Sequence, residues 1–277
     1  MARAGRDAQR EAPARSIDWS GLPASTWGAT GRTSGQDGVA VKACLRASLL
    51  EKQRCTELQR MLARGVNDAD VRAAIAVVNA SAPALAGVWR ERFAAAGRTF
   101  AVPEIRYYGW TGDGAPGLSE QSPACGELLD NAFYCLRDNQ IYYDVVFLAR
   151  LANAVRIVDK TPGTYAVASV VSHEMGHAVD VQLGITGLVR YKRELIADCF
   201  SGVAVGAVVR AAAGPSQARQ VLETTTPMTE GQLAMFLVGG PAMVDGDHPA
   251  GPVRAGYFTR GFNLGVAECT LNALEGR

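Results

Sequence analysis

Histidine is scarce in this chain of 277 residues, with only three present. Charged residues are also few: 20% of the chain, against a usual share of roughly 25%, with 28 basic residues nearly balancing 27 acidic ones. A nucleic-acid partner is therefore not expected, because binding by counterion release needs an excess of positive charge. No apolar run approaches the roughly 20 residues of a membrane helix, and the best, residues 202–213, is interrupted by Arg210. We expect no membrane span.

The remaining composition is that of a folded protein. Hydrophobic residues make up 48% of the chain, which excludes disorder throughout, and the length allows one large domain or two small ones. Residues 1–38 are rich in Gly, Ser, Thr, Ala and Arg without a sustained period, and we interpret them as a flexible leader. No linker or internal repeat divides the rest, so we expect a single domain over residues 39–277. Its expected parts are N-terminal helices (39–98), a sheet (99–160) and C-terminal helices (161–277).

The sequence has six cysteines and no CxxC pair, which argues against zinc knuckles and thioredoxin-like redox sites. They stand at Cys44, Cys55, Cys125, Cys135, Cys199 and Cys269. The even number favours disulfides. Short separations favour pairing Cys44 with Cys55 and Cys125 with Cys135, which leaves Cys199 with Cys269. Spacing alone does not fix the pairing. Disulfides predict a secreted or cell-envelope protein. The alternative is six reduced, buried cysteines in a cytoplasmic protein, and the opening run MARAGRDAQREAPARS lacks the apolar region of a signal peptide.

The pattern of apolar residues predicts an α+β protein with a small mixed or antiparallel sheet. Helical spacing recurs over residues 39–62 and again from an N-cap at Asp68 or Asp70 to about residue 95. The runs FAVPEIRYYGW, AFYCL and IYYDVVFL are rich in aromatic and β-branched residues, which predicts strands. Thr161 and Pro162 then mark the start of another helix, and helical patterning continues nearly to the end of the chain.

Two of the three histidines stand four residues apart, in the run His173-Glu174-Met175-Gly176-His177. Four residues is just over one helical turn, so both imidazoles leave the same face of a helix and can bind one ion. The flanking residues are mostly apolar, which favours a buried helix over a solvated face that carries two histidines by chance. Neutral imidazoles are zinc ligands, and a catalytic zinc site adds a third protein ligand while keeping a position for water. We therefore expect one Zn²⁺ per chain.

The third ligand is expected from the run RELIAD at residues 193–198. Gly184 and Gly187 allow the first helix to end, so that a second helix can return alongside it and present Glu194 to the ion. Asp198 lies one turn later on the same face, where it can accept a hydrogen bond from the distal N–H of a ligating histidine. The alternative for both acidic residues is a surface ion pair with arginines at helical spacing.

These residues resemble the gluzincin pattern of zinc peptidases and, more narrowly, the bacterial neutral zinc metallopeptidase family. The resemblance covers residues 124–277 and rests on four segments: CGELLDNAFYCLRDNQIYYD, SHEMGHAVD, RELIADCFSG and DHPAGPVRAGYFTRGFNLGVAEC. It implies a zincin-like fold, in which the HExxH helix packs under the sheet and later helices carry the third ligand. Residue by residue, it makes His173, His177 and Glu194 the metal ligands, Glu174 the catalytic base and Asp198 the residue that orients a histidine.

The chain departs from the family pattern directly after the second histidine. Family members commonly read GHHVQ there, whereas this chain reads GHAVD and ends the motif with Asp180. Because the change lies outside the ligand set, we expect it to affect the pocket lining or substrate preference more than zinc binding.

The expected reaction is hydrolysis of peptide bonds in a peptide or protein substrate, and we expect an endopeptidase. Zinc activates a water molecule and polarises the carbonyl, and Glu174 takes the proton and delivers it to the leaving amine. His248, which resembles a histidine of the family's closing segment, is a candidate donor to the tetrahedral intermediate, and Tyr257 is a weaker one. The alternative for His248 is an ordinary surface turn before Pro249. An extended substrate would pair with a sheet edge, for which residues 140–147 are the expected strand.

Two other functions are compatible with these residues. One is a catalytically silent, zinc-containing binding or regulatory module. The intact Glu174 disfavours it, because a structural zinc ion has no use for a base and usually has a fourth protein ligand. The other is a zinc hydrolase acting on a non-protein amide such as a cell-wall cross-link, which the sequence leaves open.

Overall fold

The structure is a computed structural model that describes residues 66–108, 125, 131–185, 188–213, 226–239 and 249–269. Several features expected from the sequence lie outside these residues. They are the leader at 1–38, the helix over 39–62, Cys44, Cys55 and His248. The expected division into one domain over 39–277 stays a prediction.

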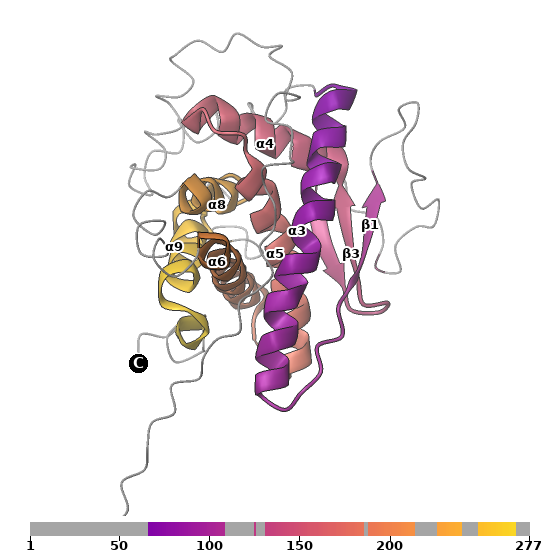
Figure 1. Cartoon of the computed structure of the whole chain (residues 1–277), viewed down its shortest axis with the longest axis vertical. Coiled ribbons are helices and arrows are strands. Elements are labelled where there is room, and N and C mark those ends of the chain that lie inside the picture. Colours follow the sequence, from indigo (N-terminus) through magenta and orange to yellow (C-terminus); the bar gives the residue numbers. More distant parts are fainter. Residues whose placement is uncertain are drawn as a thin grey trace, which may run out of the picture.

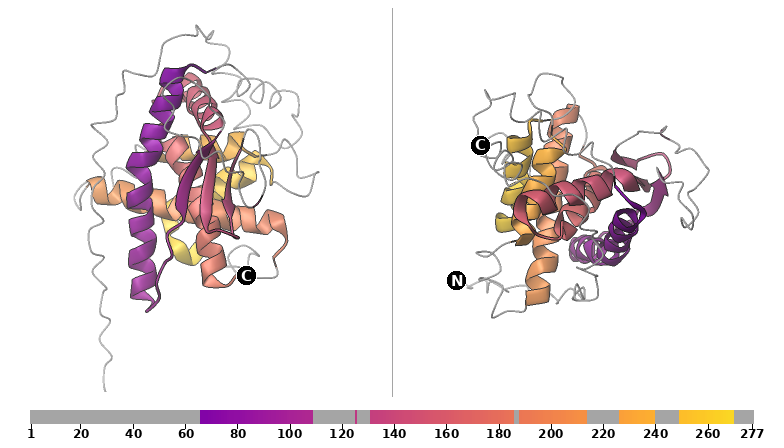
Figure 2. Two further views of the ribbon diagram at one scale, coloured as in Figure 1. Left: turned by 90° about the vertical axis from the view of Figure 1, so that its right-hand side faces the viewer. Right: turned by 90° about the horizontal axis from the view of Figure 1, so that it is seen from above.

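Six α-helices and one three-stranded sheet form the described part of the chain. In order, they are α3 (Asp68–Ala95), β1 (Glu104–Tyr108), β2 (Ala132–Cys135), β3 (Gln140–Asp144), α4 (Val145–Asp159), α5 (Thr164–Leu183), α6 (Arg190–Ala213), α8 (Thr226–Leu237), α9 (Gly251–Leu264) and the 3₁₀ helix η3 (Val266–Cys269). The sheet and α3 lie on one side, α6, α8 and α9 lie on the other, and α5 runs between them (Figures 1 and 2). This arrangement confirms the α+β, zincin-like class.

The sheet is mixed, with the strand order β1-β3-β2. β3 pairs in parallel with β1 and antiparallel with β2, so it is the central strand. β3 ends at Asp144, whose side chain caps α4 by accepting hydrogen bonds from the backbone N–H groups of Val146 and Phe147. The expected strand over residues 140–147 was therefore wrong in two respects: residues 145–147 are helical, and residues 140–144 are paired on both sides and offer no free edge.

Helix α3 begins with a capping box. The Asn67 side chain accepts a hydrogen bond from the backbone N–H of Asp70, and the Asp70 carboxylate accepts one from the backbone N–H of Asn67. The N-cap is thus Asn67 and not Asp68 or Asp70, since both acidic residues lie in the first turn. Further along α3, Trp89 packs edge-on against Phe200 of α6, with ring centroids 5.2 Å apart, which joins the helix to the core.

Helix α5, which carries the HExxH run, begins at Thr164 and is held by a carboxylate from another helix. It starts slightly later than the expected start at Thr161, because α4 extends to residue 159 and Gly163 forms the N-cap. Glycine has no side chain to cap the helix. Instead, the buried Glu230 of α8 accepts hydrogen bonds from the backbone N–H groups of Gly163 and Tyr165, at 3.1 and 2.7 Å. This carboxylate also complements the positive end of the α5 dipole.

Helices α6 and α9 pack with their backbones in direct contact. A Cβ atom on Gly202 of α6 would lie 2.0 Å from the carbonyl oxygen of Phe258. A Cβ atom on Gly261 of α9 would lie 1.9 Å from the carbonyl oxygen of Cys199. Only glycine fits at these two positions, so α9 is fixed against α6 along its length.

Two disulfides join described residues. Cys199 of α6 pairs with Cys269 of η3, and Cys125 pairs with Cys135 of β2. These are the pairings that the spacing of the cysteines favoured. They are compatible with a location outside the cytoplasm.

Helices α3 and α6 are long and apolar enough to cross a membrane. However, 61% of the most apolar stretch of α3 and 78% of that of α6 is buried inside the protein. Core helices of a folded domain have the same composition, so these two helices are weak evidence for a membrane span.

Candidate metal centre

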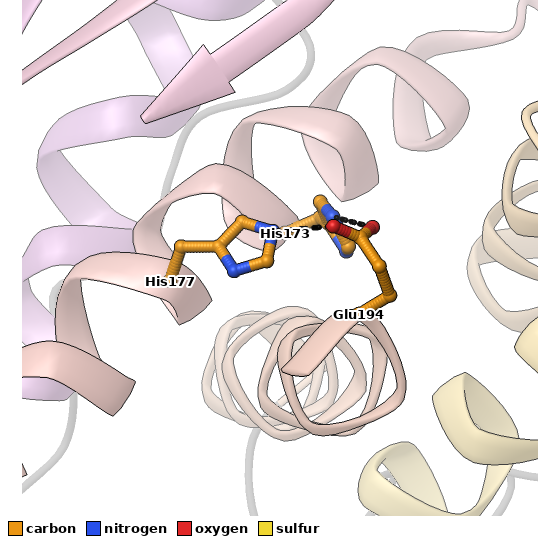
Figure 3. Close-up of side chains that lie close together, drawn as sticks. All are labelled: His173, His177 and Glu194. Atoms are coloured by element: carbon orange, nitrogen blue, oxygen red, sulfur yellow. Dashed lines mark ion pairs between the residues drawn. The ribbon is translucent and has the colours of Figure 1, made fainter. Parts of the chain in front are cut away.

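The two histidines of the HExxH run and Glu194 come together between α5 and α6. His173 Nε2 lies 3.3 Å from Glu194 Oε2, and His177 Nε2 lies 3.4 Å from Glu194 Oε1. One ligand atom from each residue can be chosen so that all lie within 4.8 Å of one another. Figure 3 shows the two imidazoles projecting from α5 toward the carboxylate of α6.

These separations fit a zinc ion. Ligand atoms placed tetrahedrally at about 2.0–2.1 Å from an ion are about 3.3–3.4 Å apart. The two nitrogen–oxygen distances, 3.3 and 3.4 Å, lie in that range, although each runs to a different oxygen of Glu194. Two imidazole nitrogens and one carboxylate oxygen are also the donor set of catalytic zinc sites, which keep a further position for water or substrate.

Two glycines bring the ligands of the two helices together. Gly184 ends α5 in the left-handed conformation, with φ of 75°, which lets the chain turn back toward α6. Gly176, inside the HExxH run, faces α6 so closely that a Cβ atom there would lie 2.9 Å from the carbonyl oxygen of Ala197. Because Ala197 stands between Glu194 and Asp198, this contact brings both acidic side chains within reach of α5.

Asp198 lies behind His173 and is fully buried. Its Oδ1 is 2.8 Å from His173 Nδ1, so that nitrogen is the donor and Nε2 is left facing Glu194. Burial alone would lower the pKa of His173. The nearby Asp198 carboxylate outweighs this effect and raises the pKa to about 10 in the metal-free protein. Burial likewise raises the pKa of Asp198, but the Arg254 guanidinium and His173 bring it below its usual value.

Arg254 of α9 is the residue that sequence reasoning missed. Its Nε and Nη2 donate to the two oxygens of Asp198, both at 2.8 Å, and its Nη2 lies 3.5 Å from Glu194 Oε2. The side chain is only 3% exposed. One signal could have indicated it: a buried Asp198 needs a cation besides a neutral histidine, and Arg254 is the arginine of the quoted segment HPAGPVR.

Glu174 lines a cavity of about 610 Å³ together with the three candidate ligands. It is 4% exposed, and burial raises the pKa of its carboxyl group, an effect that the two imidazoles partly oppose. The apolar side chains of the cavity include Phe133, Leu136, Phe147, Val170, Met235 and Leu237. Tyr257 packs against the core and is not among the described residues that line the cavity.

An HExxH helix with a glutamate presented by the next helix, under a small sheet, defines a zincin-like protein. The sequence matches the family described as "Putative neutral zinc metallopeptidase" over residues 20–271, and the chain belongs to this family. The match extends well before residue 124, where the resemblance of motifs begins, and it includes part of the expected leader.

Curated relatives give little functional detail. The chain is 26% identical over 207 residues to "Uncharacterized protein YpfJ" of Escherichia coli K12 and, equally, to the protein of that name in Escherichia coli O6:H1 strain CFT073. The aligned region covers 65% of this chain and 65% of each relative, so the chain spans less than two thirds of their length. No solved structure matches the chain significantly.

Proposed function

We propose that this protein is a zinc-dependent endopeptidase, with one Zn²⁺ held by His173, His177 and Glu194. The observation that carries the proposal is the separation of the ligand atoms, 3.3 and 3.4 Å, in a cavity that Glu174 also lines. Membership of a zinc metallopeptidase family supports the same reaction class.

In this proposal each buried polar side chain has a distinct role. A bound zinc ion would polarise the scissile carbonyl and activate a water molecule. Glu174 receives the proton of that water and delivers it to the leaving nitrogen, and the raised pKa of its carboxyl group favours proton uptake. Asp198 accepts a hydrogen bond from the Nδ1–H of His173, and Arg254 holds Asp198 ionised and oriented, so that His173 presents Nε2 toward the ligand position.

The substrate is proposed to lie along β2 and not along β3. β2 is an edge strand of the described sheet, because its partner β3 occupies only one side. Ala132, Phe133 and Tyr134 of β2 line the cavity beside Glu174. Backbone hydrogen bonds to this edge would hold an extended peptide of varied sequence, which suits an endopeptidase.

His248 stays the proposed donor to the tetrahedral intermediate, although it lies outside the described residues. The chain before it supports this role, because Gly239 lines the cavity. The chain after it lies close by, since a Cβ atom on Gly239 would be 2.4 Å from the Cα atom of Gly251. His248→Ala should retain zinc and lower kcat, about 10²-fold or more for loss of such a donor.

We further propose that the protein acts outside the cytoplasm. The Cys199–Cys269 and Cys125–Cys135 disulfides support this location, because such bonds persist in oxidising compartments. Mass determination of the native protein with and without reductant checks it; a fully reduced native protein would contradict it.

The test of the main proposal compares the wild type with Glu174→Gln. Bound metal and cleavage of casein and of a peptide library are measured for both proteins. The wild type should bind one equivalent of zinc and cleave, and Glu174→Gln should bind zinc with cleavage reduced by several orders of magnitude. Glu91→Gln, the same substitution at an exposed position of α3, is the control and should behave as the wild type.

Two results would refute the proposal. Zinc bound by the wild type without cleavage of any substrate in a broad panel would indicate a binding module. Failure of the metal-depleted protein to take up zinc would show that His173, His177 and Glu194 do not form a zinc site.

A further inference from the structure

Two arginines stand beside the candidate metal centre at the start of α6. Arg190 and Arg193 are three residues apart on this helix, so they share one face, and both line the cavity. Among the described residues that line it, the only carboxylates are Glu174 and Glu194, which belong to the metal centre. The arginine pair, Arg190 and Arg193, therefore brings two guanidinium groups to this part of the cavity, one of them paired with the buried Asp180, and the N-terminal end of the α6 dipole adds positive potential.

Arg193 is held in place from one side only. Its Nε donates to Asp180 Oδ2 at 2.8 Å, and Asp180 is fully buried. Asp180 Oδ1 has no hydrogen-bond partner among the described residues, so the terminal nitrogens of Arg193 do not close a second bond to that carboxylate. The Arg193 side chain is 37% exposed, and its terminal N–H groups are available to a molecule in the cavity.

The anchoring residue, Asp180, lies on α5 three residues after the candidate ligand His177. Its carboxylate fixes the arginine that stands directly before the candidate ligand Glu194. A fixed guanidinium loses less conformational entropy on binding than a free one, and its planar fork matches a carboxylate.

We propose that the arginine pair binds a carboxylate of the substrate, so that the protein prefers peptides with an acidic side chain, or a free C-terminal carboxylate, near the cleaved bond. This inference rests on the proposed peptidase function. Apart from Glu174 and Glu194 at the candidate metal centre, no described residue that lines the cavity is acidic, so the lining around the arginine pair has no further carboxylate to repel an acidic substrate.

Cleavage of matched peptides tests this preference. Internally quenched peptides carry Glu or Gln at each position around the cleaved bond, and each is made with a free and an amidated C-terminus. The wild type should show kcat/KM about twofold to fivefold higher for Glu at one position, or for the free C-terminus, which is the range expected for a partly exposed charge pair. The Glu/Gln comparison reports a side-chain carboxylate, and the amide comparison reports a terminal one.

Three variants locate the effect. Arg193→Gln and Arg190→Gln should abolish or reduce the preference, and higher ionic strength should weaken it in the wild type. Lys192→Gln is the matched control: it makes the same change of charge on the same turn of α6, at a residue that does not line the cavity, and it should leave the preference intact. Arg190 is exposed, so Arg190→Gln keeps the test valid if Arg193→Gln unfolds the protein by leaving Asp180 unpaired.

A binding measurement separates this inference from the proposed function. Fluorescence anisotropy of the same labelled peptides is measured with zinc-loaded Glu174→Gln, in which no turnover is expected. Tighter binding of the acidic peptide, lost in Glu174→Gln/Arg193→Gln, supports the inference even if the wild type cleaves nothing. Equal binding and cleavage of Glu and Gln, free and amidated peptides would overturn it while leaving the peptidase proposal standing, as would a preference that survives in both arginine variants.

Discussion

Replacing Arg254 with methionine should be among the most damaging single substitutions in this protein. Asp198 is fully buried and Arg254 is 3% exposed, and the two form a forked pair with both nitrogen–oxygen distances at 2.8 Å. Arg254→Met leaves a buried carboxylate without its cation. Removing one partner of such a pair costs about 3–5 kcal/mol.

The magnitude is large enough to measure directly. For a domain of about 150–250 residues, each kcal/mol lowers Tm by about 2–4 °C, so the expected loss is roughly 6–20 °C. The measurement uses chelator-treated protein, because zinc binding would add its own stabilisation to both proteins. Zinc affinity, measured separately by competition with a chelator, should fall by about 10–100-fold, as for other losses of support behind a ligating histidine.

A surface arginine on the same helix is the control. Arg260 pairs with Glu268 at 3.2 Å, but both side chains are 37% exposed, so Arg260→Met should cost less than about 1 kcal/mol. The double variant Asp198→Asn/Arg254→Met should lose less unfolding free energy than the two single variants lose together. In the double variant no buried carboxylate is left without its cation. If Arg254→Met costs no more than Arg260→Met, the pair does not have the buried, forked geometry described above and the reasoning fails.

Three further outcomes follow from the packing and the titrating groups. Gly261→Ala should destabilise by about 1–3 kcal/mol or more, since its Cβ atom would lie 1.9 Å from a carbonyl oxygen of α6; Gly256→Ala on the same helix has nothing within 4 Å and should be neutral or slightly stabilising in denaturant unfolding. Burial raises the pKa of Tyr107 and Tyr142 to about 12, above the unfolded value of about 10; the neutral phenols are thus favoured in the fold, and the free energy of unfolding should be unaffected by these groups below pH 10 and fall as pH rises toward 12. Tyrosinate absorbance during an alkaline titration checks the two late ionisations, and their appearance at the ordinary value would contradict the burial. Zinc uptake at neutral pH should release a proton, because the pKa of His173 is about 10 without metal and its Nε2 must be unprotonated to ligate; calorimetry in two buffers of different ionisation enthalpy measures this release, and an absence of buffer dependence would contradict it.

The HExxH helix could be predicted because its signal is local. Two histidines at a spacing of four share a helix face whatever the tertiary structure, and the apolar residues around them place that face inside. Glu194 and Asp198 could be predicted for a related reason: Gly184 ends α5, and the next helix repeats a four-residue spacing of carboxylates. The structure brings these four side chains together between α5 and α6.

The strand over residues 140–147 could not be read correctly, because periodicity does not distinguish a short buried strand from a buried helix. The residues from Val145 onward are β-branched, aromatic or apolar, and this composition suits a buried strand as well as a buried helix. The boundary is decided by Asp144, whose carboxylate binds two backbone N–H groups of the first turn of α4. Aspartate before an apolar run is an N-cap signal, and it outweighs the β propensity of the residues that follow.

The need of a buried Asp198 for a cation does not by itself select Arg254, because the two residues are distant in the sequence. Arg254 stands 56 residues after Asp198 and 81 after His173, and only the close packing of α9 on α6 through Gly202 and Gly261 delivers it to the site. Glycine pairs of this kind are visible in the sequence, but nothing local indicates which helix they face.

A divalent cation would balance the charges buried around the candidate metal centre. Glu174, Glu194 and Asp198 are carboxylates of at most 9% exposure, and Arg254 is the one buried guanidinium of the described residues that contacts them. Ionised together, these groups leave two negative charges in a region where uncompensated charge is costly. Protonation of His173 offsets part of that excess in the metal-free protein, which is why burial fails to lower its pKa. A zinc ion offsets all of it while leaving Glu174 ionised, so the same charge count that holds Arg254 in the core also supports zinc as the resident ion and Glu174 as the base.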